Sequence, residues 1–499
     1  MTRRWGVLAV AALGAALLAG GPGGCTVNPA TGEKVFTGGI SGPQEQAEGR
    51  RLHPQVLRQF GPALENPALQ RYVDSVGQLL ARTAERRDLQ YTFTVVDTDI
   101  VNAFAVPGGY IYITRGLLAL FDSEAELAAV LGHELGHITA LHYARGRGQA
   151  ILAQLGVLAA GILAGQAAPG SGAERIVGEL GGKAAFAYLR SFSRENEYES
   201  DDLGIRYLAR AGYDTGAVAR MLGKLRAHGR LEAALAGRSP DRIDRFDYTA
   251  THPAPLARIR RAAANAARTK PRDPMVAREI YLGKIDGMVY GGSRRQGFAR
   301  GRDFIHPELR FRFSVPRRFI VHNMPQAVVA NSRDGGRIIF RLQPRGASRS
   351  AAGFLRARWG SRFSIARIDE FTVNTMPAAS TRFAARGRGG IVDIAVLAAG
   401  ARGGKVYELV LVFPRKPGSR LEEAYRTVRR SLREMTAAEA ATHRPRRIRV
   451  IRARRGDTQE SLARRMAVER RRLERFRVLN GLGPGNRIAA GRSVKIVAE

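Results

Sequence analysis

The sequence predicts an α+β fold, in which a mainly helical first half with a small sheet precedes a second α+β domain and a shorter C-terminal part. Apolar residues recur at three-to-four spacing in residues 44–60 and 69–84, as they do in amphipathic helices. Residues 91–97 and 110–114 read as short strands. Residues 269–274 contain two prolines and read as a linker between the two larger domains.

Residues 1–25 read as an export signal, with Arg3 and Arg4 before a short apolar stretch at residues 7–19. An uncleaved membrane anchor is the alternative, but about 13 apolar residues are fewer than a spanning helix needs. Cys25 is the only cysteine, so no internal disulfide can form, and its position resembles that of a bacterial lipoprotein acceptor. We expect a periplasmic protein, lipidated at Cys25 and anchored to the outer membrane. Ordinary cleavage or a buried thiol is the alternative.

The charge of the chain is strongly positive, with 80 Lys and Arg against 44 acidic residues and a net charge of +36. Such basicity can indicate nucleic-acid or anionic membrane partners. Only eight of the basic residues are Lys, so the charge reflects a preference for Arg along all 499 residues. The sequence contains no helix-turn-helix, zinc-finger or aromatic-interleaved RNA motif. We therefore expect attraction to anionic envelope polymers and no nucleic-acid partner.

The main chemical motif is HELGH, in which His133 and His137 are four residues apart. The segment begins with Ser123 and Glu126, which can form a capping box, and then shows helical apolar spacing. Two imidazoles four apart on a helix share one face and can bind one cation, while Glu134 can reach a metal-bound water. This is the HExxH arrangement of zinc peptidases. A chance match on a solvated helix is the alternative.

A catalytic zinc needs a third protein ligand and an open fourth position. Residues 193–214 read as a second helix that ends at a capping glycine, and Glu197 and Asp201 share one of its faces. Glu197 is the candidate ligand, and Asp201 can accept the free ring N–H of a liganding histidine. Glu195 and Glu199 are the alternative ligands. A solvated acidic face is the alternative for the whole run.

Four motifs carry a family resemblance. In chain order they are NAFAVPGGYIYITRGLL at 102–118, HELGH at 133–137, the SREN-EYESD-AGYD block at 193–214, and THPAP at 251–255. Residues 28–265 resemble the zinc endopeptidases related to the CAAX prenyl protease, and in particular the exported bacterial members that act in quality control of outer-membrane proteins. The resemblance implies a gluzincin-type peptidase domain over residues 26–268 with one Zn²⁺ per chain. It also implies roles for five residues: His133, His137 and Glu197 as zinc ligands, Glu134 as catalytic base and Asp201 as the carboxylate that orients a ligand.

In this family, the strand at residues 110–114 is the edge of a small sheet over the zinc. An exposed edge can hold a peptide by main-chain hydrogen bonds, which tolerates many sequences. We therefore expect Ala103, Phe104 and Ala105 to bind substrate. A purely structural hairpin is the alternative.

His252 and Arg258 correspond to family residues that point toward the cleft. Either side chain could stabilise the oxyanion of a tetrahedral intermediate. Alternatively, His252 could occupy the fourth zinc position and keep the enzyme latent, or both residues could be a helix cap and a surface cation. His142 is not expected to be a ligand, because nine residues beyond His133 on one helix it would face about 180° away.

Residues 149–165 are apolar almost all round and shorter than a membrane span, so we expect them to be buried beside the active site, with lipid contact as the alternative. Residues 279–436 read as an α+β domain of unknown function. Its expected elements are strands at 309–315, 337–342, 391–398 and 405–413 and a helix at 419–435 with a Ser419/Glu422 capping box.

Residues 446–499 resemble a LysM module, on the strength of Arg-Gly-Asp-Thr at 455–458 and Leu-Asn-Gly-Leu at 479–482. The resemblance implies a βααβ fold that binds glycans containing N-acetylglucosamine, and hence peptidoglycan. Fourteen arginines between positions 444 and 477 would add electrostatic attraction to anionic envelope components. A generic basic tail is the alternative.

Together these features predict a zinc metalloendopeptidase of the bacterial cell envelope. Its expected substrates are misfolded or misassembled envelope proteins, because no side-chain pocket is evident, and its expected tether is peptidoglycan. The alternative is an envelope chaperone or scaffold whose protease site is latent.

Overall fold

The computed structural model describes residues 24–150, 192–244, 252, 256–324, 326–387 and 390–499. The expected export signal lies almost entirely outside these residues, and so does the apolar stretch from residue 151 onward. Of the THPAP motif only His252 is described. Among the described residues, no helix combines the length and the apolarity that crossing a membrane requires.

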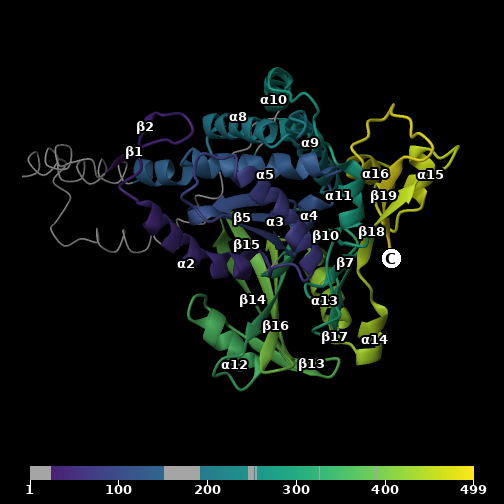
Figure 1. Cartoon of the computed structure of the whole chain (residues 1–499). Helices are drawn as coiled ribbons and strands as arrows, with labels where there is room; N and C mark the ends of the chain where they lie inside the picture. Colours follow the sequence, from purple (N-terminus) through teal and green to yellow (C-terminus); the bar gives the residue numbers. More distant parts are fainter. Residues whose placement is uncertain (1–23, 151–191, 245–251, 253–255, 325, 388–389) are drawn as a thin grey trace, which may run out of the picture.

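The first part of the chain packs two helices against a small sheet (Figure 1). α2 (Gly42–Phe60) starts at a capping box formed by Ser41 and Gln44, and α3 (Pro67–Ala81) starts at an Asn66 cap. Both helices were predicted. The sheet contains β3 (Thr92–Val96), β4 (Ala103–Val106) and β5 (Tyr110–Thr114).

β5 is the central strand of this sheet, parallel to β3 and antiparallel to β4. The expectation that residues 110–114 form an edge was therefore wrong, and β3 and β4 are the edge strands instead. β4 escaped prediction because it has only four residues, all apolar, so it shows no alternation. Its antiparallel pairing with β5 follows from the tight Pro107–Gly109 turn between them.

α5 (Glu124–Thr139) is the buried centre of this domain, and α8 (Arg194–Arg210) lies alongside it (Figure 1). Ser123 caps α5 as predicted, but the Glu126 side chain accepts from the Asp122 N–H instead of closing the box. α8 ends as predicted, because Gly212 takes a positive φ of 80° that glycine adopts without strain. α9 (Ala217–Leu235) and α10 (Leu256–Arg268) pack on this pair.

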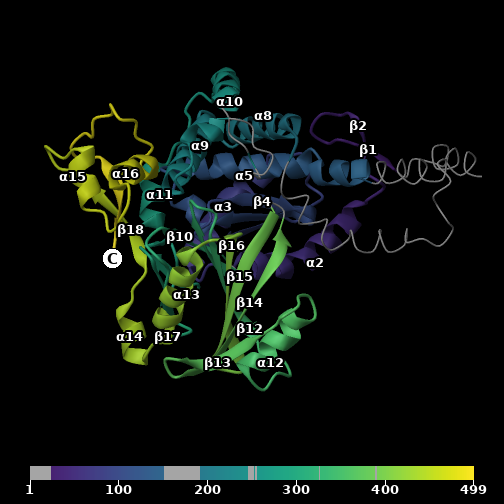
Figure 2. The same cartoon turned by 180° about the vertical axis from the view of Figure 1, so that it is seen from behind.

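The middle of the chain is α+β, as predicted. Its larger sheet has the strand order β10-β11-β12-β16-β15-β14-β13, all antiparallel. The strands are β10 (Phe319–Met324), β11 (Ala327–Ser332), β12 (Arg337–Pro344), β13 (Ile368–Val373), β14 (Met376–Gly387), β15 (Gly390–Ala401) and β16 (Lys405–Pro414). Figure 2 shows the long strands β14 to β16 extending away from the N-terminal helices toward α12 (Ala351–Leu355).

A smaller sheet, in the order β17-β9-β8-β7, completes the middle part. Its strands are β7 (Phe298–Arg300), β8 (Asp303–His306), β9 (Phe311–Ser314) and β17 (Arg433–Glu434). α13 (Ser419–Ser431) covers β9 and β16 with its apolar face. The predicted Ser419/Glu422 box is absent, because the helix begins one residue earlier, with Gly418 as its N-cap.

The C-terminal part runs β18 (Arg446–Arg452), α15 (Gln459–Arg464), α16 (Arg472–Leu479) and β19 (Ser493–Ala498). β18 pairs with β19 on one side and with the short β6 (Val289–Tyr290) on the other. The apolar residues of this C-terminal part, together with α11 (Arg278–Ile285), belong to the same buried core as α3, α5 and α9. Both views show this part beside α9 and α11 (Figures 1 and 2). The middle part therefore leaves at β6 and returns at β18, two neighbouring strands.

Candidate metal centre

Close contact between α5 and α8 brings the HExxH motif next to the acidic helix. A Cβ on Gly136 would lie only 3.0 Å from the backbone of Ser200, so the glycine allows the two helices to approach closely. Farther along, a Cβ on Gly204 would lie 3.2 Å from the backbone N of His133. These small residues set the distance between the two sets of candidate ligands.

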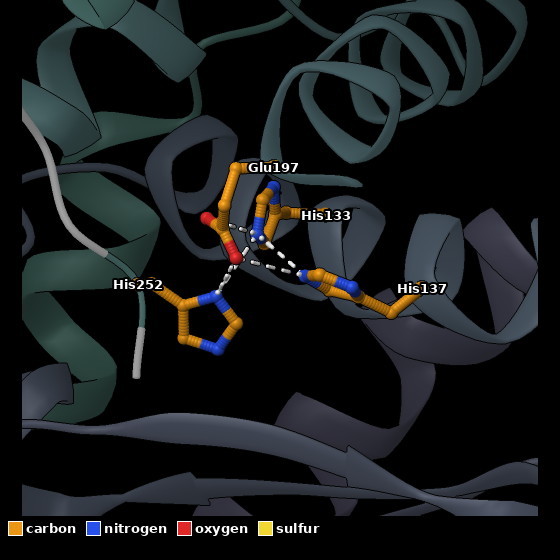
Figure 3. A group of neighbouring side chains, drawn as sticks. All are labelled: His133, His137, Glu197 and His252. Atoms are coloured by element: carbon orange, nitrogen blue, oxygen red, sulfur yellow. Dashed lines mark hydrogen bonds and ion pairs between the residues drawn. The ribbon is translucent and has the colours of Figure 1, made fainter. Parts of the chain in front are cut away.

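His133, His137, Glu197 and His252 form one group whose ligand atoms all lie within 4.8 Å of one another (Figure 3). The Nε2 atoms of His133 and His137 are 3.1 Å apart. Glu197 places its carboxylate oxygens 3.6 Å from His133 Nε2 and 3.5 Å from His137 Nε2. Neutral imidazoles and a carboxylate are zinc's usual nitrogen and oxygen ligands, so the donor set fits this ion.

Glu197, and neither Glu195 nor Glu199, is the carboxylate that reaches the two histidines. Glu195 is exposed, and Glu199 turns to His142 and Arg145. Burial alone would raise the pKa of Glu197, but Arg258 and His252 hold it well below its usual value. Burial lowers the pKa of His137 well below its usual value. Both groups are therefore in the protonation state that a ligand needs near neutral pH.

His252 joins the group from a segment far along the chain. Its Nδ1 lies 3.0 Å from Glu197 Oε1 and 3.3 Å from His133 Nε2. Its Nε2 lies 3.5 Å from Glu134 Oε1. His252 is therefore the fourth possible ligand of the group.

Glu134 is buried and faces this group, and apart from the 3.5 Å contact with His252 and the nearby Ala105 backbone its carboxylate oxygens have no close hydrogen-bond partner among the described residues. Burial raises the pKa of Glu134, while His252, His133 and the Ala105 backbone act against the rise. A buried carboxylate with so few partners is costly, so its position indicates a role for a water or substrate that arrives later.

Asp201 lies where the sequence placed it, with Oδ1 3.0 Å from His133 Nδ1. Arg258 donates from Nε and Nη2 to the two Asp201 oxygens, at 2.7 and 2.8 Å, and its Nη1 pairs with Glu197. Burial would lower the pKa of His133, but Asp201 and Glu197 raise it to about 9, so this ring must release a proton when it binds a metal near neutral pH. Arg258 is thus held by two carboxylates, and its expected oxyanion role stays a prediction.

His142 and Phe192 are the neighbours that the sequence reasoning did not find. From the sequence, His142 was expected to lie on the same helix as His133. In the structure α5 ends at Thr139 and Leu141 has a φ of 58°, so His142 lies beyond the end of that helix. Its Nδ1 lies 2.8 Å from His137 Nδ1. The Phe192 ring stacks on His137 with 3.9 Å between centroids. No local pattern indicated either contact.

The comparisons with known proteins agree with this geometry. Residues 67–266 match the family model described as Peptidase family M48. These residues are therefore similar to M48 peptidase domains. M48 metalloproteases use zinc, so the expected cofactor is confirmed, and the four-residue group is where this part of the chain can hold it.

Several curated relatives match the same part of the chain. The Beta-barrel assembly-enhancing protease of Escherichia coli (strain K12) is 31% identical over 245 residues, 48% of this chain and 48% of that protein. The protease of the same name from Yersinia pestis is 33% identical over 247 residues, which are 49% of this chain and 48% of that protein. The Arabidopsis thaliana Mitochondrial metalloendopeptidase OMA1 is 32% identical over 212 residues, which are 42% of this chain and 38% of that protein. The chain spans about half the length of the curated relatives it matches.

One solved structure shows only a weak likeness to the chain. A Bacteroides thetaiotaomicron crystal structure aligns with a TM-score of 0.23 and 14% identity, covering 30% of this chain and 53% of that one.

Proposed function

We propose that the chain is a zinc-dependent metalloendopeptidase. The observation that carries this proposal is the convergence of two imidazoles and one carboxylate from separate helices next to the buried carboxylate of Glu134. When bound, Zn²⁺ would supply a Lewis acid that polarises the scissile carbonyl and acidifies a water.

The residues of the chain then have distinct tasks. His133, His137 and Glu197 hold the ion, and Asp201 keeps the His133 ring oriented through its Nδ1. Glu134 takes a proton from the attacking water and returns it to the leaving amine, which its elevated pKa favours.

We place the substrate along the edge strand β4, which includes Ala103, Phe104 and Ala105. β4 packs against α5, and the Ala105 backbone lies close enough to Glu134 to affect its pKa. A peptide paired with this edge by main-chain hydrogen bonds would pass the metal group whatever its side chains. We therefore propose broad cleavage of misfolded or misassembled envelope proteins. The printed name of the E. coli relative, a β-barrel assembly-enhancing protease, supports this substrate class.

The purified full chain and its Glu134→Gln variant test the catalytic proposal. We expect both to bind close to one zinc per chain and only the wild type to cleave casein, because Gln cannot accept the proton. Equal cleavage by the two proteins, or a wild type without zinc, would contradict the proposal.

The second candidate, a chaperone or scaffold with a latent protease site, is favoured by the position of His252. Its ring sits beside Glu197 and between the ligands and Glu134, where water or substrate must enter. If this ring keeps the site closed, His252→Ala will raise the casein-cleavage rate while zinc stoichiometry stays near one. A lower rate would instead support the oxyanion role. If suppression of client aggregation survives Glu134→Gln, the chaperone function gains support.

We also propose two envelope attachments. Cys25 is exposed, in β1 (Cys25–Val27), which pairs with β2 (Lys34–Phe36), and this exposure is compatible with a lipid anchor. Cys25→Ala should then abolish labelling of the cellular protein by radioactive palmitate and release it from outer-membrane fractions.

The C-terminal residues 446–499 are the proposed LysM-like peptidoglycan tether, supported by their strand–helix–helix–strand order. The full chain should bind peptidoglycan sacculi and be released by soluble N-acetylglucosamine oligomers. Release by salt alone would indicate a basic tail instead, since only electrostatic binding is screened in this way.

A further inference from the structure

His142 links the ligand His137 to a charged cluster behind the metal group. It is fully buried, with its Nδ1 2.8 Å from His137 Nδ1 and its Nε2 3.0 Å from Glu199 Oε2. The same Glu199 oxygen accepts from Arg145 Nη1 at 2.8 Å, and Glu199 Oε1 accepts from Asn28 Nδ2 at 3.2 Å. Two donors from one segment, His142 and Arg145, and a third from Asn28 therefore converge on one carboxylate.

This order of contacts determines the direction of each hydrogen bond. Glu199 can only accept, so a proton of His142 lies on Nε2, and in the neutral ring Nδ1 presents a lone pair to His137 Nδ1 and to Ser200 Oγ, which lies at 3.4 Å. A short contact between two ring nitrogens requires one donor, so His137 carries its proton on Nδ1. His137 Nε2 is then left with its lone pair, on the side that faces Glu197 and His133.

We propose that His142 is a positioning residue that fixes the tautomer and orientation of His137 for metal binding, with Glu199 and Arg145 fixing His142 in turn. The inference rests on the proposed zinc site and deepens it. His133 is held by a carboxylate directly, through Asp201. His137 instead contacts the ring of His142, which in turn contacts the carboxylate of Glu199. The two ligand histidines are therefore oriented in different ways.

The backbone around His142 is built for this contact. The helix break at Ala140 and Leu141 turns the chain back, and the left-handed φ of 58° at Leu141 is unfavourable for a non-glycine residue. An uninterrupted helix would carry His142 away from the ligand face. Phe192 also stacks on the buried His137 ring, so both His142 and Phe192 hold the ring in place.

The test measures zinc affinity of the full chain by competition with a chelator. His142→Phe keeps the ring shape but removes the acceptor, and we expect a loss of affinity of roughly 10–100-fold. His142→Asn can place an amide oxygen near the Nδ1 position, and we expect it to retain most of the affinity. His306→Phe is the matched control, because it removes another buried histidine, on β8, and should leave the affinity unchanged.

A second measurement separates positioning from a structural role. Thermal unfolding of the metal-free proteins reports the effect of each substitution on the fold alone. Affinity loss in His142→Phe beyond the control, with rescue by His142→Asn, supports the proposal. Wild-type affinity in His142→Phe overturns it, and so does equal loss in both His142 variants. If the wild type binds no zinc at all, the proposed zinc site itself fails, which is a separate result.

Discussion

Lys495, in the last strand, points its ammonium at Asp122, just before the helix that carries HExxH, with Nζ 3.1 Å from Oδ1. The lysine is fully buried and also donates to the carbonyls of Ala119 and Phe121, at 2.9 and 2.6 Å. Asp122 accepts from Lys224 as well, at 2.6 Å. The C-terminal part is thereby fixed to the start of α5 by a buried ionic cluster.

Replacement of Lys495 by Met should destabilise the whole chain. The change keeps the apolar stem but leaves two carbonyls and part of Asp122 unpaired in the interior, which costs about 3 kcal/mol. Chemical unfolding of metal-free protein measures the loss. Lys405→Met, at an exposed strand position, is the control and should change stability by less than about 0.5 kcal/mol. Equal effects of the two substitutions would contradict the docking described here.

Gly136→Ala should weaken zinc binding. The added methyl would lie 3.0 Å from the Ser200 backbone, so α8 must shift and carry Glu197 away from the histidine pair. We expect a loss of about 1–3 kcal/mol of stability from overpacking, together with a lower zinc affinity. Gly223→Ala in α9 meets no atom within 4 Å and should instead add roughly 0.5–1 kcal/mol through helix propensity. An unchanged zinc affinity in Gly136→Ala would count against the spacing argument.

Arg258→Met should make the metal-free protein depend on zinc for its stability. The substitution leaves the buried carboxylates of Glu197 and Asp201 without their cation, which costs about 3–5 kcal/mol. Added zinc should restore part of this loss, because it supplies positive charge at the same place. The free energy of unfolding of Arg258→Met, measured with and without added zinc, checks this expectation. Arg261→Met, on the same helix, breaks a partly exposed pair with Asp202 and should cost no more than about 1 kcal/mol.

The middle part should lose stability in mild acid because of His306. Burial lowers the pKa of this ring from 6.5 to about 4, and its Nδ1 accepts the Leu309 N–H. Below pH 6.5 the unfolded chain takes up a proton that the folded chain refuses until about pH 4. Stability is therefore complete above pH 6.5 and falls between these values, by up to roughly 3 kcal/mol.

Tryptophan fluorescence can follow this transition, because Trp359 lies in the middle part and Trp5→Phe makes it the only tryptophan. Urea unfolding at pH 7 and pH 4.5 gives the difference. His306→Asn keeps an acceptor for Leu309 but does not titrate, so its stability should vary less over the same range. A variant as acid-sensitive as the parent would show that other groups are responsible.

The sequence by itself determined what depends on hydrogen bonds within one turn of the chain. The four-residue spacing of His133 and His137, the Ser123 cap and the Gly212 ending all follow from helix geometry and local backbone preferences. The strands at residues 91–97 and 110–114 follow from their β-rich composition in the same way.

Only the tertiary structure decided which of several equivalent local candidates meet. Glu197 was chosen over Glu195 and Glu199 by the rotation of α8 against α5, which is set where Gly136 meets Ser200. His142 faces His137 because the chain turns at Leu141, and Lys495 is buried because the C-terminal part shares a core with α5. Each of these contacts depends on how separate segments pack or on a turn that ends the helix, so no local periodicity records the choice.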